Sequence, residues 1–176
     1  MDYKFRDSWI MWYHNPYDCN WDNNSYSNLI EIDNLSLFWK YYYSMENHLP
    51  DINDAMYFVM KRIDSENIIW PYWEDPYNID GGYWSFKIDC NNTKEAWKYL
   101  MIYLLSESLC INPEDNKNIN GISISPKKAF SIVKIWTKRI ENVNILNKIP
   151  YFDIDNAFYK LHQSNIDNDN KKKNKI

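Results

Sequence analysis

The sequence predicts a single domain of the α/β (α+β) class, in which a sheet and several helices share one core. Residues 3–13 alternate polar and aromatic side chains, which is typical of a strand. Residues 95–108 place apolar side chains at helical spacing, and residues 121–137 predict two more strands joined by a short loop. At 176 residues and without internal repeats, the chain is long enough for one sizeable core.

The first third of the chain predicts a strand, a loop and a helix in that order. Residues 14–28 are dense in turn formers and predict a loop with one large aromatic residue, Trp21. A tryptophan in such a loop either anchors it to the core or belongs to a binding surface. Asn34 can cap a helix whose aromatic residues form one stripe, namely Phe38, Trp39, Tyr42 and Tyr43. Residues 49–67 predict a loop followed by a strand or a short helical turn.

Residues 70–84, WPYWEDPYNIDGGYW, are the most informative stretch of the chain. They contain Gly81 and Gly82, two of only three glycines, which predict backbone that turns tightly or is closely approached. The order of residues suggests two strands joined by a loop, with Trp73 and Glu74 at its rim. An indole beside a carboxylate suits guanine, because it offers a stacking face and an acceptor for the ring N–H and the amino group. The alternative is a structural hairpin with buried tryptophans and a solvated acid pair.

The second half of the chain predicts a long helix and two strands. Asn92, followed three residues later by Glu95, resembles a capping box. The helix should end near Ser108, and its apolar face consists of Trp97, Leu100, Met101, Leu104 and Leu105. A polar loop at 111–120 precedes two strands within 121–137, and these are joined by Pro126, Lys127 and Lys128.

The end of the chain is increasingly polar. Asp153 or Asp155 can cap a short last helix that contains Ala157, Phe158 and Leu161. Beyond it, residues 164–176 are low in complexity and predict a disordered tail, whose lysine run is most simply solvated. Because no domain boundary precedes this tail, residues 1–163 predict one domain.

Composition and charge exclude several classes of function. A net charge of −4 argues against a general nucleic-acid binder, although a protein that holds one end of an RNA needs only a local basic cluster. The cysteines, Cys19, Cys90 and Cys110, form no C-x-x-C pattern and predict reduced thiols. The three histidines show no ligand spacing, so neither a metal site nor a cofactor is expected. The lack of a signal peptide or a transmembrane-length apolar run predicts a soluble cytoplasmic protein without a membrane partner.

Five motifs follow one another in an order that is informative as a set. They are WIMWY (9–13), NLSLFW (34–39), WEDPYNIDGGYW (73–84), EAWKYLMIYLLSES (95–108) and GISISPKKAFSIVKIWT (121–137). Together they resemble the eukaryotic translation initiation factor 4E family, the messenger-RNA cap-binding proteins. The chain is identified as a divergent, trimmed member over residues 3–140, and this divergence would fit a virus-encoded protein.

The resemblance implies a curved antiparallel sheet with three helices on its convex face and a cap slot on its concave face. In that slot, Trp21 and Trp73 would sandwich the cationic 7-methylguanine and gain cation–π energy over ordinary stacking. Glu74 would accept hydrogen bonds from both guanine donors, which adenine lacks. Trp136 would touch the methyl group. The implied ligand is the capped end of a messenger RNA.

The side of the slot that would bind phosphates departs from the family pattern. Lys127 matches the arginine that grips the cap phosphates, and Lys128 could assist it. The family's arginine after the glycine pair is Tyr83 here, and its second phosphate lysine falls on Ile132, with Lys134 two positions on. Lysine makes less directional contacts with phosphate than arginine does. Weaker or altered phosphate recognition is therefore expected.

The resemblance also implies a partner-binding surface on the first two predicted helices. Leu35 and Trp39 would dock the scaffold protein of the initiation complex, or a regulatory binding protein, beside Lys98, Tyr99 and Ile102 of the second helix. The family has a Trp-Leu-Glu run where this chain has Trp97-Lys98-Tyr99, which puts the usual scaffold motif in question. The expected protein is a monomeric, non-enzymatic cap-binding factor of the cytoplasm, or of the host cytoplasm if viral. A cap-binding repressor that does not recruit the scaffold is the alternative.

Two other classes of function compete with these. An enzyme that acts on nucleotides or caps would use Glu74 and Asp75 as metal-binding or acid–base groups. The sequence lacks a Gly-rich phosphate loop, a Ser/His/Asp order and the repeated glutamates of a pyrophosphate hydrolase. The other alternative is an interaction module whose cap slot has decayed. Retention of Trp21 and Trp73 together with Glu74 argues against decay.

Overall fold

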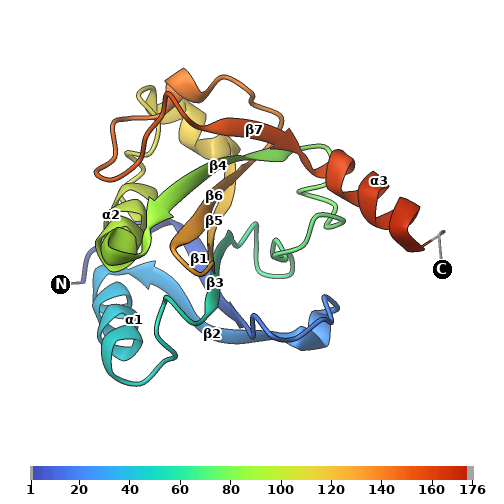
Figure 1. The fold of residues 1–176 in the computed structure, drawn as a ribbon. Helices are drawn as coiled ribbons and strands as arrows, with labels where there is room; N and C mark the ends of the chain where they lie inside the picture. The colour runs from blue at the N-terminus through green and yellow to red at the C-terminus, as the bar shows by residue number, and fades with distance from the viewer. Residues whose placement is uncertain (1, 174–176) are drawn as a thin grey trace.

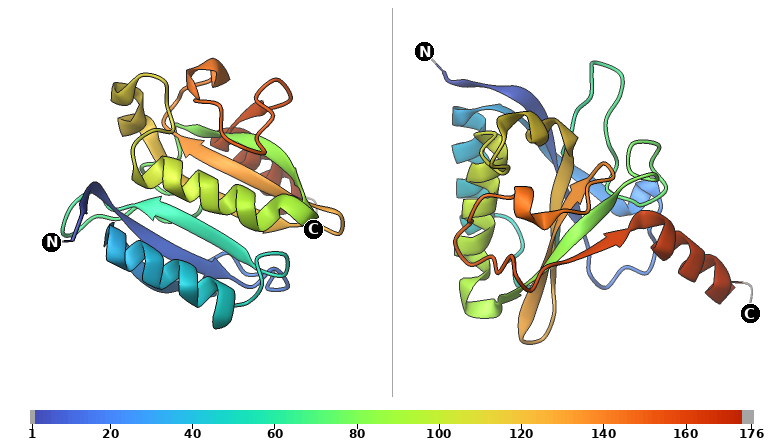
Figure 2. Two further views of the ribbon diagram at one scale, coloured as in Figure 1. Left: turned by 90° about the vertical axis from the view of Figure 1, so that its left-hand side faces the viewer. Right: turned by 90° about the horizontal axis from the view of Figure 1, so that it is seen from above.

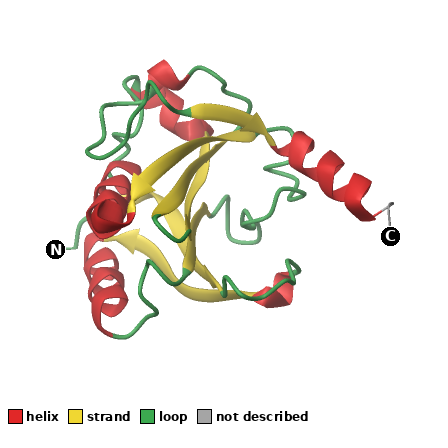
Figure 3. Ribbon diagram, in the orientation of Figure 1, coloured by secondary structure: helices red, strands yellow, loops and turns green. Residues whose placement is uncertain are grey.

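A seven-stranded antiparallel sheet organises the computed structural model, which describes residues 2–173 (Figures 1 and 3). Along the chain the strands are β1 (Lys4–His14), β2 (Tyr26–Asn34), β3 (Met56–Lys61), β4 (Gly82–Asp89), β5 (Ile119–Pro126), β6 (Phe130–Thr137) and β7 (Phe158–Leu161). The helices are α1 (Leu35–Asn47), α2 (Thr93–Leu105) and α3 (His162–Lys173). Four short 3-10 turns complete the described part, namely η1 (Asn23–Ser25), η2 (Cys90–Asn92), η3 (Pro113–Asn118) and η4 (Val143–Ile145).

The sheet is curved, and its two faces are covered differently. Its strand order is β2-β1-β3-β5-β6-β4-β7. Helices α1 and α2 lie side by side against the convex face, whereas α3 extends from the end of β7 on the opposite side (Figures 1 and 2). The predicted fold class, a single α/β domain with a curved antiparallel sheet and three helices, is confirmed. The third helix stands on the side of the concave face rather than behind the sheet.

The alternation within β1 separates two clusters of buried side chains. Trp9 and Met11 face the convex side and pack into the main core beneath α1 and α2. Ile10 and Trp12 face the concave side, where a smaller cluster also contains Trp136. Because side chains alternate between the faces of a strand, one apolar run can serve both layers. The concave cluster is the floor on which the functional site is built.

Helix α1 begins where the sequence predicts. The Asn34 side-chain oxygen accepts a hydrogen bond from the backbone N–H of Leu37 at 2.9 Å, which satisfies one of the free donors at the helix start. The predicted aromatic stripe is divided: Phe38 is buried, whereas Trp39 is 52% exposed and Tyr43 is 61% exposed. The convex surface therefore carries large uncovered aromatic side chains.

Helix α2 begins at Thr93 with Asn92 at its N-cap, as predicted, but the predicted capping box is wrong. Asn92 makes no side-chain capping bond, so the expected capping box with Glu95 does not form. The turn η2 precedes the helix instead, and the Asp89 side chain accepts from the backbone N–H of Asn91 at 2.9 Å. Glu95 pairs with Lys98 one turn later, at 2.6 Å.

Residues 26–28 also differ from prediction, because they belong to β2 rather than to the loop.

The C-terminal segment differs most from the sequence-based prediction. A short helix was expected near Asp153, but residues 158–161 form strand β7, because the edge of β4 offers free backbone groups to pair with. The predicted disordered tail from residue 164 is helical as far as residue 173, and residues 174–176 lie outside the described range. Tertiary contacts hold the first turn of α3: His162 and Asn165 are buried, and Asn165 donates to the Tyr83 hydroxyl at 3.3 Å.

Residues 70–84 do not form the expected hairpin. Only the part from Gly82 onward is a strand, and residues 62–81 are a long loop on the concave side. A Cβ atom at Gly81 would collide with the Thr137 carbonyl oxygen, and one at Gly82 would collide with that of Lys160. The glycine pair therefore permits the close approach of neighbouring backbone rather than a tight turn. No helix within residues 2–173 has the length and apolar content needed to cross a membrane.

Candidate functional site

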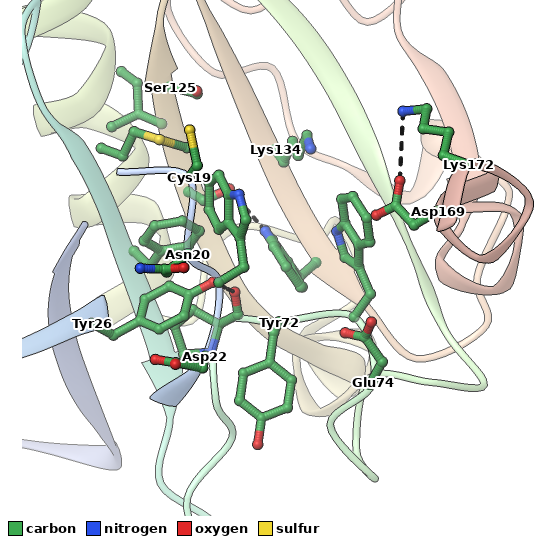
Figure 4. Close-up of a pocket in the computed structure, with 18 residues that line it drawn as sticks. Cys19, Asn20, Asp22, Tyr26, Tyr72, Glu74, Ser125, Lys134, Asp169 and Lys172 are labelled. Carbon is green, nitrogen blue, oxygen red and sulfur yellow. Dashed lines mark hydrogen bonds and ion pairs between the residues drawn. The ribbon is translucent and has the colours of Figure 1, made fainter. Parts of the chain in front are cut away.

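A cavity of about 650 Å³ opens on the concave face. Its walls come from segments far apart in the sequence: the loop at 19–22, the loop at 71–74, strands β3, β5 and β6, and helix α3. Figure 4 shows Asn20, Asp22 and Tyr26 on one side of the cavity, with Glu74 and Asp169 on the other. Of the residues predicted for a nucleotide site, the structure brings Trp21, Trp73, Glu74 and Trp136 together here.

Trp21 stands on one side of the cavity with half of its surface exposed. Its indole stacks on the His14 imidazole with ring centroids 4.1 Å apart and an angle of 5° between the planes. The His14 ring nitrogen Nε2 donates to the Asn20 carbonyl oxygen at 2.9 Å, and Asp22 accepts from the backbone N–H of Asn24 at 2.9 Å. These bonds fix the residues on both sides of Trp21. One face of its indole packs on His14, and its exposure leaves stacking surface available to a ligand.

The loop that carries Trp73 is braced by buried polar groups. The Asp75 carboxylate is 2% exposed and accepts from the backbone N–H groups of Trp70 at 3.1 Å and Tyr77 at 2.8 Å. The Asn78 amide donates to the carbonyls of Trp70 and Tyr72, each at 2.9 Å. Burial raises the pKa of Asp75 despite these bonds. Asp75 is therefore a structural group, and the expected acid pair at 74–75 is divided between two roles.

We expect the Asp75→Ala substitution to destabilise the protein by about 2 kcal/mol, because it leaves two partly buried backbone N–H groups without their acceptor. Urea unfolding would measure the change. Asp80→Ala, at an exposed position of the same loop, is the matched control and should leave the unfolding midpoint unchanged. Equal stability of the two variants would show that Asp75 does not hold the loop.

Glu74 follows Trp73 directly and, unlike Asp75, is exposed to solvent at the rim of the cavity (Figure 4). Tyr26 lies across the cavity from Glu74. Burial of the Tyr26 hydroxyl raises its pKa, and the negative charge of Glu74 raises it further. Trp136 is buried on the floor, where its indole N–H donates to the Ser123 hydroxyl at 2.9 Å. The arrangement offers an exposed indole, a half-buried indole, a carboxylate beside the second indole and an aromatic floor.

The lysines are arranged differently from the sequence-based prediction. Lys127 and Lys128 lie at the exposed tip of the β5–β6 hairpin and do not line the cavity. Lys134 does line it, with its Nζ 4.3 Å from the centre of the Tyr83 ring and 6.0 Å from that of Trp73. Burial, together with the charges of Lys160 and Lys127, lowers the pKa of Lys134 to about 8.

Several cavity residues carry no signal in the sequence. Tyr26 donates from its hydroxyl to the Pro71 carbonyl at 3.1 Å and so joins β2 to the loop that carries Trp73. Asp169 and Lys172 reach the cavity from α3, where their side chains pair at 3.6 Å (Figure 4). These positions could not be found by pattern, because they reach the cavity through long-range contacts and through a helix in a segment predicted to be disordered.

The residues predicted for partner binding lie on the other side of the molecule. Leu35 is 40% exposed and Ile102 is 39% exposed, on α1 and α2 respectively, in the same layer as Trp39. Lys98 and Tyr99 are half-buried, with the Lys98 Nζ 5.6 Å from the Tyr99 ring centre. The site on the concave face and this convex surface are therefore separated by the sheet.

Within residues 2–173, no cluster of three histidine, cysteine or acidic residues is placed to hold a metal ion. The three cysteines are free, and Cys19 is exposed at the cavity. What the cavity presents is stacking surface, a carboxylate beside an indole, and the ammonium groups of Lys134 and Lys172. These groups suit the binding of a planar, hydrogen-bonding ligand with an anionic extension.

Comparison with known proteins identifies the family. The model of the family described as eukaryotic initiation factor 4E matches residues 4–176. The chain belongs to this family. Eukaryotic translation initiation factor 4E-2 of Schizosaccharomyces pombe is 26% identical over 153 residues, a match that covers 84% of this chain and 58% of that protein. The initiation factor 4E homologue of Acanthamoeba polyphaga mimivirus is 39% identical over 75 residues, which is 43% of this chain and 25% of the homologue.

Solved structures of initiation factor 4E share the fold. Ascaris suum eIF4E-3 in complex with the m7G cap superposes with a TM-score of 0.67 at 20% identity, covering 82% of this chain and 78% of that one. Caenorhabditis elegans eIF4E-3, in complex with the 4E-binding protein Mextli and a cap analogue, gives a TM-score of 0.65 at 22% identity over 79% and 76% of the two chains. The chain spans 58% of the length of the Schizosaccharomyces pombe relative and 64% of the length of the relative from Eremothecium gossypii.

Proposed function

We propose that this protein binds the 7-methylguanosine cap of messenger RNA in the concave cavity and acts in translation initiation. The observation that carries the proposal is the pairing of Trp21 and Trp73 around one cavity, with Glu74 beside the second indole. Cap complexes of Ascaris suum and schistosome members of the family support it. The protein acts as a binding factor rather than an enzyme, and we place its activity in the cytoplasm.

The chemistry of the ligand explains why these residue types are suitable. A 7-methylated guanine is cationic, so it is attracted to the faces of two electron-rich indoles more strongly than an uncharged base. The Glu74 carboxylate accepts from the ring N–H and the amino group of guanine, and the Trp73 backbone N–H faces the carbonyl oxygen. Trp136 on the floor contacts the methyl group. Adenine lacks this donor pattern and is rejected because the carboxylate would remain unpaired.

Retention on a resin carrying 7-methylguanosine triphosphate tests the proposal. The protein should bind the resin, and free 7-methylguanosine triphosphate should elute it, whereas GTP and ATP at equal concentration should not. A resin that carries unmethylated GTP controls for adhesion of this aromatic-rich chain. Elution by all three nucleotides, or failure to bind, would contradict cap binding and favour an interaction module with a decayed slot.

The convex surface of α1 and α2 is the proposed site for a scaffold or regulatory protein. Trp39 and Leu35 supply exposed apolar area, and complexes of Caenorhabditis elegans eIF4E-3 with Mextli are precedents among the structural relatives. Where the family has a Trp-Leu-Glu run, this chain has Trp97-Lys98-Tyr99, and Lys98 forms an ion pair with Glu95. The charge pattern of this surface therefore differs from that of the family. That observation favours, as a second candidate, a cap-binding repressor that does not recruit the usual scaffold.

We expect Trp39→Ala to weaken binding of a 4E-binding peptide by about 30-fold, because a central aromatic anchor of an interface contributes about 2 kcal/mol or more. Fluorescence anisotropy of a labelled peptide from a 4E-binding protein would measure the affinity. Lys40→Ala, on the same helix and also exposed, is the matched control. No binding by the wild-type protein would favour the repressor, and equal binding by both variants would place the partner elsewhere.

A further inference from the structure

His14 is a fully buried polar residue that lies behind the cavity wall without lining the cavity. It is the last residue of β1 and stands in register between Tyr26 on β2 and Met56 on β3. Its side chain belongs to the same concave layer as that of Trp12, two residues earlier, because side chains alternate between the faces of a strand. Strand pairing on both sides makes His14 a firmly held point of the sheet.

The His14 ring contacts Trp21 in two ways. The imidazole and the indole stack with their centroids 4.1 Å apart and 5° between their planes. The His14 Nε2–H donates to the carbonyl oxygen of Asn20, the residue before Trp21, at 2.9 Å. The Tyr26 ring lies beside both, with its centroid 5.0 Å from that of His14 and 6.3 Å from that of Trp21. One side chain of the sheet therefore fixes the plane of the indole and the peptide that carries it.

Within residues 2–173, hydrogen bonds tie the loop at 15–22 to the sheet only through His14. The other hydrogen bonds of this loop join positions two or three apart, such as the bond from the Asn20 N–H to the Asp18 carboxylate at 2.8 Å. Bonds of this kind shape turns but do not attach them to the sheet. Because Trp21 is also 51% exposed, the orientation of its indole depends chiefly on the His14 ring.

We infer that His14 is a positioning residue for base stacking, which orients Trp21 before a ligand arrives. This inference rests on the proposed function, in which Trp21 and Trp73 enclose the base. An indole that is already held in place loses little freedom when a base stacks on it, whereas a mobile indole must be ordered at the expense of affinity. The bound state is then a stack of imidazole, indole, base and second indole.

The first test measures the affinity of the full chain for 7-methylguanosine triphosphate in two His14 variants. His14→Leu removes the ring and should weaken binding about three- to tenfold, the usual cost of ordering one large side chain. His14→Phe keeps a flat ring for Trp21 to stack on and should bind within about twofold of the wild type. In both variants the Asn20 carbonyl, which belongs to an exposed residue, can accept from water instead.

Tyr13→Leu is the matched control. It removes an aromatic ring from the neighbouring position of β1, whose side chain packs against the core on the convex side. It should leave the affinity unchanged. Equal losses of affinity in His14→Leu and His14→Phe would overturn the inference, because the stacked ring would then not be what holds Trp21.

A double-mutant cycle with Trp21→Ala shows whether His14 acts through Trp21. Without the indole there is nothing to orient, so His14→Leu should cause no further loss of affinity in the Trp21→Ala protein. A general structural role of His14 would instead lower the affinity equally in both backgrounds. Additive losses would therefore overturn the positioning role.

The orientation of Trp21 can also be observed without a ligand. In protein labelled with fluorotryptophan, the fluorine resonance that is missing from Trp21→Ala belongs to Trp21. His14→Leu should shift this resonance, because the imidazole no longer stacks on the indole, and Tyr13→Leu should not. If Trp21→Ala weakens binding but His14→Leu binds as the wild type does, the positioning role is overturned and the slot stands. If the wild type binds no cap ligand, the proposed function fails, and the role of His14 in binding fails with it.

Discussion

Replacing Glu74 with glutamine should lower the affinity for 7-methylguanosine triphosphate by about 10- to 100-fold, the usual effect of losing a hydrogen-bonded charge. The carboxylate presents two acceptors to the two guanine donors, whereas the amide turns one donor group toward the ligand. Glu74 is exposed, and the loop backbone is held by hydrogen bonds to Asp75 and Asn78 instead. The substitution should therefore leave the loop conformation unchanged. Isothermal titration calorimetry would measure the affinity of both proteins.

Two comparisons make the Glu74 result specific. Glu66→Gln, at an exposed position of the same β3–β4 loop, removes the same charge away from the cavity and should leave the affinity unchanged. Discrimination between the methylated guanine and methylated adenine nucleotides should also decrease in Glu74→Gln. Equal affinities for the wild type and Glu74→Gln would mean that the carboxylate does not recognise the base.

Replacing Trp21 with alanine should lower the affinity for the same ligand by about a hundredfold, since base stacking on an aromatic side chain contributes about 1–3 kcal/mol and a cationic base adds to it. The available face of Trp21 is held open by its stack on His14. The side chain is 51% exposed, so its removal should leave the unfolding temperature nearly unchanged.

Trp39→Ala is a closely matched control for Trp21→Ala, because Trp39 is 52% exposed but lies on the convex face. It should bind the nucleotide as the wild type does. Comparison of the two variants therefore distinguishes the loss of any exposed tryptophan from the loss of a stacking surface in the cavity. A Trp21→Ala protein that binds the ligand with wild-type affinity would show that the loop at 19–22 is anchored for structural reasons only.

Local patterns in the sequence predict much of the fold. The period-two alternation of β1, the Asn34 cap of α1 and the hairpin of β5 and β6 each depend on neighbouring residues and are present as expected. β7 and the first turn of α3 were mispredicted because they form through distant partners, namely the edge of β4 and the buried pocket around His162. A polar segment next to an open strand edge can be ordered by that edge, whatever its composition.

In the candidate site too, some residues could be singled out from the sequence and others could not. Trp21, Trp73 and Glu74 could be selected from the sequence because a large aromatic in a polar loop and an indole beside a carboxylate are unusual by themselves. Lys134 stood only two positions from the place of a family lysine in the sequence, and its burial could not be predicted, because a lysine on an alternating strand is ordinarily a solvated residue. Its contact with the Tyr83 ring, at 4.3 Å from the ring centre, and its place in the cavity wall exist only in the folded chain.

The most direct measurement is a titration of tryptophan fluorescence with 7-methylguanosine triphosphate, with unmethylated GTP as the comparison ligand. Strong, saturable quenching by the methylated nucleotide alone is predicted, because the cationic base enters between Trp21 and Trp73. The quenching should be much reduced in Glu74→Gln. Equal quenching by both nucleotides, or none by either, would contradict a cap-binding slot on the concave face.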